Sequence, residues 1–172
     1  MKLRSIKLLI LLATCFVTAC GQAAPKGKKL IDDINAAKVK ARSLSSEAER
    51  KRKEAGENQA EHDRLIEEAA NVYGQASDTL AEASSKAKEL AKVKSPSWYE
   101  EYFNLQSQLL NNLAQLAAGA KEELLIRKNG PPSEAQLQTW KESLKRIREE
   151  DDEFRKQIAS IEKRQRVVLI TE

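Results

Sequence analysis

The stretch ERKRKEAGENQAEHDR, residues 49–64, decides the arrangement of the whole chain because it contains no large apolar side chain. On both sides of it, apolar residues recur every three or four positions, as they do on one face of a helix. The chain can turn at Gly56-Glu57-Asn58, or a single helix can run from 29 to 94. At about 1.5 Å per residue, that single helix would be about 100 Å long.

A turn at Gly56 is favoured because it gives helical segments of similar length, which cover one another in an up-down-up-down bundle. The segments are 29–55, 59–94, 97–128 and 133–168. The predicted fold class is therefore all-α, a four-helix bundle. Three helices, the first of them very long, are the alternative.

Two of these segments have distinctive apolar patterns. The second carries an alanine-rich face, which predicts close helix packing, at Ala69, Ala76, Ala83 and Ala87. In the fourth, the apolar register stretches across REEDDEF, because seven positions separate Ile147 from Phe154.

Two breaks separate the later segments. The first, KSPSWYEE (94–101), places Ser97 three residues before Glu100, which is the spacing of a capping box. The second, KNGPPSEAQ (128–136), offers Asn129-Gly130 as a helix end, followed by Ser133 and Gln136 as a second capping box.

The final residues, RVVLITE (166–172), are apolar and mostly β-branched in their middle, which suits an extended segment better than a helix face. Two interpretations follow. The terminus packs on the end of the bundle near Trp98, or it is an edge strand offered to a partner. We favour packing near Trp98.

The first twenty residues have the features of a secretory signal peptide. Basic MKLRSIK precedes the uncharged run LLILLATCFVTA, whose 12 residues are too few to cross a membrane as a helix. Val17-Thr18-Ala19-Cys20 resembles the lipobox of bacterial lipoproteins. The resemblance implies cleavage between Ala19 and Cys20 and acylation of the Cys20 thiol, which anchors the mature chain in a membrane. Cys15 would leave with the signal peptide.

The resemblance also implies a domain organisation and a location. Residues 1–19 are the signal peptide, 20–28 the lipidated N-terminus and a flexible tether, and 29–172 the helical domain. In enteric lipoproteins an Asp after the lipidated Cys favours retention in the inner membrane. Gly21 therefore favours the outer membrane, with the domain facing the periplasm.

The charge of the chain argues against nucleic-acid binding. The formal net charge is +4, but Lys2, Arg4 and Lys7 belong to the signal peptide. Without them 27 basic and 26 acidic residues remain, so no basic excess is left to neutralise phosphates.

Catalytic and metal-binding patterns are weak, so we expect no enzyme activity and no cofactor. His62 is the single histidine and is expected to be solvated. Trp98 and Trp140 lie on apolar stripes and are expected in the core rather than in a sugar site. The acidic run 149–153 lacks the ligand spacing of a calcium loop and is expected to face solvent.

The sequence supports three functional hypotheses. The first is a lipid-anchored, noncatalytic interaction module or structural protein with a protein partner. Its candidate partner surface is the charged tip, defined as Arg50, Lys51, Arg52, Lys53, Glu57, Glu61 and Asp63. The second is a small-ligand or lipid-binding protein that uses the bundle interior, which an apolar cavity of several hundred Å³ would favour. The third is a spacer, coiled coil or homo-oligomer built on one long first helix.

Overall fold

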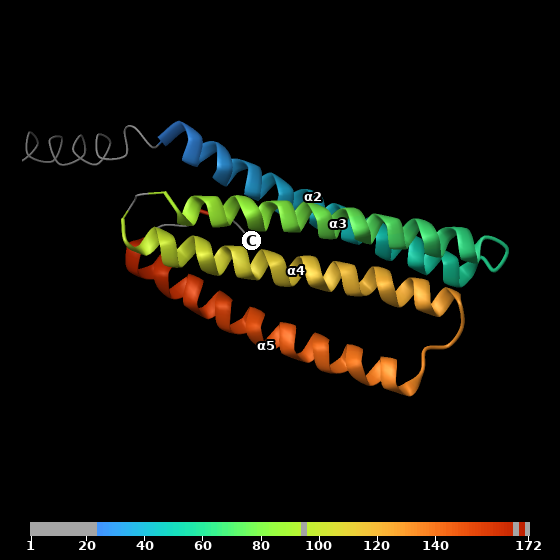
Figure 1. Cartoon of the computed structure of the whole chain (residues 1–172). Coiled ribbons are helices and arrows are strands. Elements are labelled where there is room, and N and C mark those ends of the chain that lie inside the picture. Colours follow the sequence, from blue (N-terminus) through green and yellow to red (C-terminus); the bar gives the residue numbers. More distant parts are fainter. Residues whose placement is uncertain (1–23, 94–95, 167–168, 171–172) are drawn as a thin grey trace, which may run out of the picture.

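The computed structural model describes residues 24–93, 96–166 and 169–170. Within them four helices follow one another: α2 (Ala24–Glu57), α3 (His62–Ala91), α4 (Trp98–Lys128) and α5 (Glu134–Gln165). Successive helices run antiparallel, so the fold is the all-α four-helix bundle that the sequence predicted (Figure 1). The predicted signal peptide and Cys20 lie outside the described residues.

The turn near Gly56 is confirmed. The N–H of Asn58 donates to the carbonyl oxygen of Glu54 at 3.0 Å, which closes α2, and α3 begins four residues later at His62. A continuous helix from 29 to 94 is therefore excluded. The polar residues of the turn lie at an exposed end of the α2–α3 hairpin (Figure 1).

The predicted boundary between tether and helical domain was wrong. Helix α2 begins at Ala24, so residues 24–28, which the sequence assigned to a flexible tether, are helical. Pro25 does not prevent this, because the first turn of a helix leaves its N–H groups without intrahelical acceptors in any case.

One of the two predicted capping boxes forms. The Ser133 hydroxyl oxygen accepts from the N–H of Gln136 at 3.3 Å, while the Gln136 carbonyl oxygen accepts from the N–H of Ser133 at 2.8 Å. The box at Ser97 was wrong, because Ser97 has helical backbone angles and its side chain makes no capping bond. A capping residue normally has an extended backbone, which aims its oxygen at the first free N–H groups.

Two cores of the described residues hold the helices together, and α5 contributes to only one. The larger core takes residues from all four helices and from the C-terminal segment; its fully enclosed large side chains are Ile34, Tyr102, Phe103, Leu110 and Ile161. The smaller core lies near the α2–α3 turn and comes from α2, α3 and α4 alone: Ala55, Leu65, Ile66, Ala69, Ala70 and Leu124. The bundle thus has four helices at one end and three at the other.

The alanines of α3 allow the close packing that the sequence predicted. Helix α3 packs against α2 and against α4. Five of its alanines are completely buried: Ala69, Ala70, Ala76, Ala83 and Ala87. Without larger side chains in between, the neighbouring backbones can approach.

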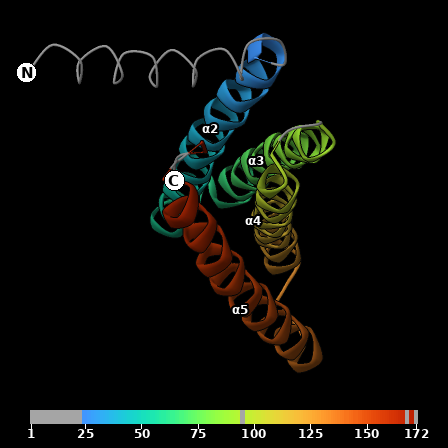
Figure 2. The ribbon, with the colours of Figure 1, turned by 90° about the vertical axis from the view of Figure 1, so that its left-hand side faces the viewer.

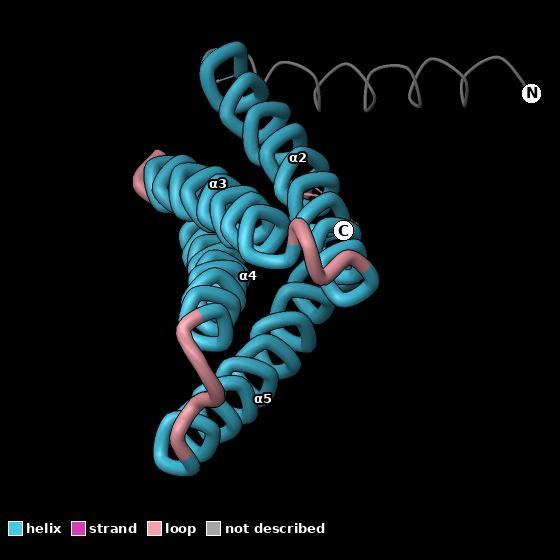
Figure 3. The backbone as a smooth tube through the Cα atoms, turned by 90° about the vertical axis from the view of Figure 1, so that its right-hand side faces the viewer, coloured by secondary structure: helices cyan, strands magenta, loops and turns pink. Residues whose placement is uncertain are grey.

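Helix α5 is inclined to α4, and its N-terminal end lies away from the other helices (Figures 1 and 2). The backbone tube shows the same divergence from the opposite end (Figure 3). No residue from 134 to 146 is buried. Trp140 belongs to neither core and is only half-buried, so its assignment to the core was wrong.

Polar groups replace the apolar contact where α5 leaves α4. Asp151 lies four positions after Ile147 and is buried, so it occupies the core position that the stretched register left without an apolar residue. Nearby, the Asn112 amide donates to Glu150 at 3.2 Å. A carboxyl group resists desolvation, so the apolar seam between the two helices is interrupted here.

The described part of the C-terminal segment packs on the bundle. Ile170 is buried in the larger core, and half-buried Leu169 packs against it, as does Trp98. The Leu169 carbonyl oxygen accepts from the Asn35 amide of α2 at 3.3 Å. This agrees with a packed terminus, while Val167 and Val168 lie outside the described residues.

Candidate binding groove and charged tip

The structure brings the residues of the charged tip together at the α2–α3 turn. Lys51 on α2 pairs with Glu68 on α3 at 2.6 Å, and the Lys51 ammonium lowers the pKa of that carboxyl. Arg50 pairs with Glu54 one turn later on α2. These two cations of the predicted partner surface are therefore directed to acids of the same hairpin.

Further ion pairs at the tip also join an arginine to an acid of the α2–α3 hairpin. Arg52 binds Glu49 at 2.6 Å and lowers the pKa of that carboxyl. Arg64 binds Glu61 at 2.7 Å. Exposed pairs of this kind add little to stability, so their main effect is to balance the charge of the tip.

His62 is partly exposed at the start of α3, and its Nδ1 lies 3.1 Å from an oxygen of Asp63. Among the described residues no group of three histidine, cysteine or acidic side chains could hold a metal ion. None of the described helices is long and apolar enough to cross a membrane.

A second candidate site, whose lining residues the sequence did not identify, opens where α5 diverges. We call it the leucine groove: a cavity of about 400 Å³ lined by all four helices. Its apolar residues come mainly from α4, with one each from α2 and α3: Ala41, Leu80, Leu109, Leu110, Leu113, Leu116 and Ala117. Cavities of 300–1,000 Å³ with mostly apolar walls are typical of small-molecule sites.

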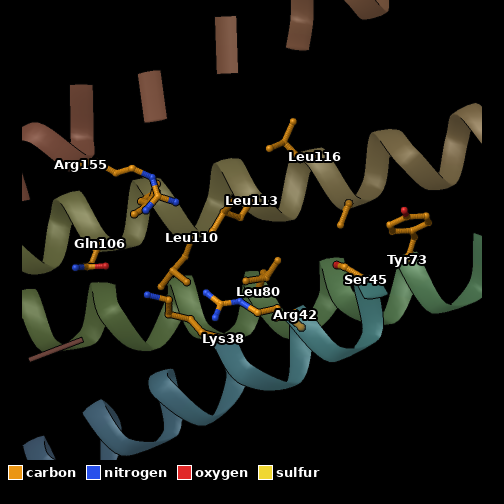
Figure 4. Close-up of a pocket in the computed structure, with 13 residues that line it drawn as sticks. Lys38, Arg42, Ser45, Tyr73, Leu80, Gln106, Leu110, Leu113, Leu116 and Arg155 are labelled. Atoms are coloured by element: carbon orange, nitrogen blue, oxygen red, sulfur yellow. The ribbon is translucent and has the colours of Figure 1, made fainter. Parts of the chain in front are cut away.

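Every charged side chain that lines the leucine groove is cationic. Lys38 and Arg42 lie one turn apart on α2, and Arg155 comes from α5. Figure 4 shows all three extending from their helices toward the row of leucines on α4. Burial raises the pKa of Asp151, and the positive charge of Arg155 partly offsets that increase. The groove thus combines an apolar wall with a cationic rim.

Gln106 adds a buried polar group to the same cavity. Its side chain is 3 % exposed and extends from α4 toward α3 (Figure 4). The amide nitrogen donates to the hydroxyl oxygen of Tyr102 at 3.3 Å. Its Oε1 has no hydrogen-bond donor among the described residues. Buried acceptors are normally satisfied, so this oxygen calls for a donor that lies outside the protein's own side chains.

A smaller cavity of about 100 Å³ continues from the groove toward the C-terminal segment. The two cavities share four lining residues: Lys38, Gln106, Leu109 and Arg155. Ile170 and Glu162 line the smaller one.

Tyr102 connects Glu162 and Ile170, the two residues named above in the lining of the smaller cavity. Its completely buried hydroxyl donates to Glu162 of α5 at 2.9 Å and accepts from the N–H of Ile170 at 3.2 Å. Burial, opposed by the Ile170 hydrogen bond, raises the pKa of Tyr102 to about 12. The neutral hydroxyl therefore links α4, α5 and the C-terminal segment.

No family model, curated protein or solved structure matches this chain.

Proposed function

We propose that this chain is a lipid-anchored, noncatalytic helical protein of the cell envelope, and that its function is to bind a small ligand in the leucine groove. The lipobox resemblance at Val17-Thr18-Ala19-Cys20 supports the anchor. Gly21, which follows Cys20, supports a location at the outer membrane, facing the periplasm. The groove supports the binding role.

One observation carries the preference for ligand binding over a protein-interaction module. An apolar cavity of several hundred Å³ is the feature that would favour ligand binding over a protein-interaction module. The leucine groove, at about 400 Å³ and with leucines and alanines along its wall, satisfies that criterion.

A neutral apolar dye, phenylnaphthylamine, tests the binding role. The chain lacking residues 1–20 is suitable, because both cores lie within residues 24–170. We expect saturable binding of one dye per chain, with a rise in fluorescence. Leu113→Trp fills the groove and should abolish binding, and Leu116→Trp is a second filling variant in case the first does not fold.

The matched control is Val39→Trp, which adds an indole on α2 at a residue that is 68 % exposed and does not line the groove. It should bind dye like the unmodified chain. Equal dye binding by all three variants would contradict the assignment of the groove.

The anchor has its own test. Mass spectrometry of the mature N-terminus should find acylated Cys20, and Cys20→Ala should leave the precursor uncleaved. An unmodified Cys20 thiol in the mature protein would refute the anchor without affecting the groove.

The charged tip is a second candidate site, for a protein partner, because residues 56–61 form a continuous exposed segment at its centre. Crosslinking in native membranes from a photoreactive group at Glu57 would identify such a partner. The same group at Lys141 on the exposed side of α5 is the control. Identical products from both positions would count against the tip.

A further inference from the structure

We propose that the ligand of the leucine groove is an amphiphile with one acyl or alkyl chain and an anionic head group. This inference rests on the proposed function and adds the chemical class of the ligand.

The cationic rim assigns the sign of the head group. Lys38, Arg42 and Arg155 line the groove from α2 and α5, and no acidic residue lines it. An anion placed between the two helices would face positive charge on both sides. Charge-assisted hydrogen bonds to carboxylate or phosphate are stronger than those between neutral groups, and arginine can form two in parallel.

The apolar wall assigns the tail. The lining residues of α4 from Leu109 to Ala117 cover eight steps of the helix, or about 12 Å at about 1.5 Å per residue. A row of this length fits an extended chain better than a compact ring system. Ser45 and Tyr73 also line the cavity, so the wall is polar in places away from the leucines.

Gln106 supports a ligand with a hydrogen-bond donor as well as an anion. Its Oε1 is buried, lies at the cavity shared by the two pockets, and has no donor among the described residues. Lys38 and Arg155 line the same shared region. A hydroxyl on the head group, or a protonated acid, would supply the donor beside these cations.

Isothermal titration of the chain lacking residues 1–20 with decanoate, decyl phosphate and decanol, each below its micellar concentration, tests the class. We expect both anions to bind at one site, at least about tenfold more tightly than decanol. Decanoate should bind about tenfold more tightly than octanoate, because each buried methylene contributes a constant increment.

The rim is tested by Arg42→Ala, with Lys40→Ala as the matched control. Both side chains are exposed on α2, but Lys40 does not line the groove. Arg42→Ala should weaken decanoate binding about tenfold and leave decanol binding unchanged, while Lys40→Ala should change neither.

The outcomes separate this inference from the proposed function. If decanol binds as tightly as decanoate and Arg42→Ala weakens neither, the anionic class is wrong although the groove still binds a ligand. If decanoate binds Leu113→Trp unchanged, it binds elsewhere and both claims fail. Within the class, tighter binding of decyl phosphate indicates a phospholipid-type head group, and tighter binding of decanoate indicates a fatty acid.

Discussion

Tyr102→Phe should destabilise the bundle far more than the loss of one oxygen atom suggests. The hydroxyl donates to Glu162 and accepts from the Ile170 N–H and the Gln106 amide, all within 3.3 Å. Hydrogen bonds to charged groups contribute about 1.5–3 kcal/mol, and a buried donor left without an acceptor costs about 1–3 kcal/mol. Because Glu162 is partly exposed, we take a total of about 2–3 kcal/mol.

Urea unfolding followed by far-UV circular dichroism measures this difference, using the chain lacking residues 1–20. In thermal unfolding the same loss should lower Tm by about 4–12 °C, at about 2–4 °C per kcal/mol for a domain of this size. Hydrogen exchange at the Ile170 amide should lose its protection, because its acceptor has been removed.

Tyr73→Phe is the matched control, since it makes the same chemical change at a half-buried tyrosine. Its hydroxyl reaches Glu49 at 3.5 Å, a long contact that should contribute little. If each substitution changed the unfolding free energy by less than about 0.5 kcal/mol, Tyr102 would not be the residue that joins α4, α5 and the C-terminal segment.

Three further predictions concern the bundle. Burial raises the pKa of Asp151, so the folded state keeps the carboxyl proton to higher pH than the unfolded state does. Stability therefore falls as pH rises from the unfolded-state pKa to the folded-state pKa. Asp151→Asn should be more stable than the unmodified chain at pH 7, and acid unfolding curves should show that this advantage disappears below the ordinary carboxyl pKa. Ser133→Ala removes the capping box and should lower the unfolding free energy by about 1 kcal/mol in urea, whereas Ser97→Ala should leave it unchanged. Ala83→Leu overfills a completely buried position on α3 and should cost about 1–3 kcal/mol by the same measurement, unlike Ala81→Leu on the exposed side.

Helix positions were predictable where the sequence contains an interruption with one physical meaning. The polar stretch around Gly56 has no large apolar side chain to bury, and the chain turns just after it. Asn129-Gly130 ends α4, and Gly130 adopts a φ of 138°, a conformation that side chains disfavour. Ser97 has the same spacing to a glutamate, but its capping box does not form. A cap needs an extended backbone at the capping residue, whereas the backbone of Ser97 is helical.

The leucine groove was not predictable from apolar periodicity. Periodicity assigned Leu109 and Leu113 to a core face, but it does not say whether a fourth helix covers that face along its whole length. One signal was present: the seven-residue gap between Ile147 and Phe154 marks the place where α5 loses apolar contact with α4. The cationic rim needed the structure, because Arg42 and Arg155 are far apart in sequence and meet only across the groove.

The central claim, that the leucine groove holds a ligand in the cell, is tested most directly by native mass spectrometry of the full-length protein purified from its own cell envelope. We expect one small amphiphile retained per chain, absent from Leu113→Trp and present in Val39→Trp. A mass equal to that of the acylated chain alone in all three preparations, or the same adduct retained by Leu113→Trp, would contradict it.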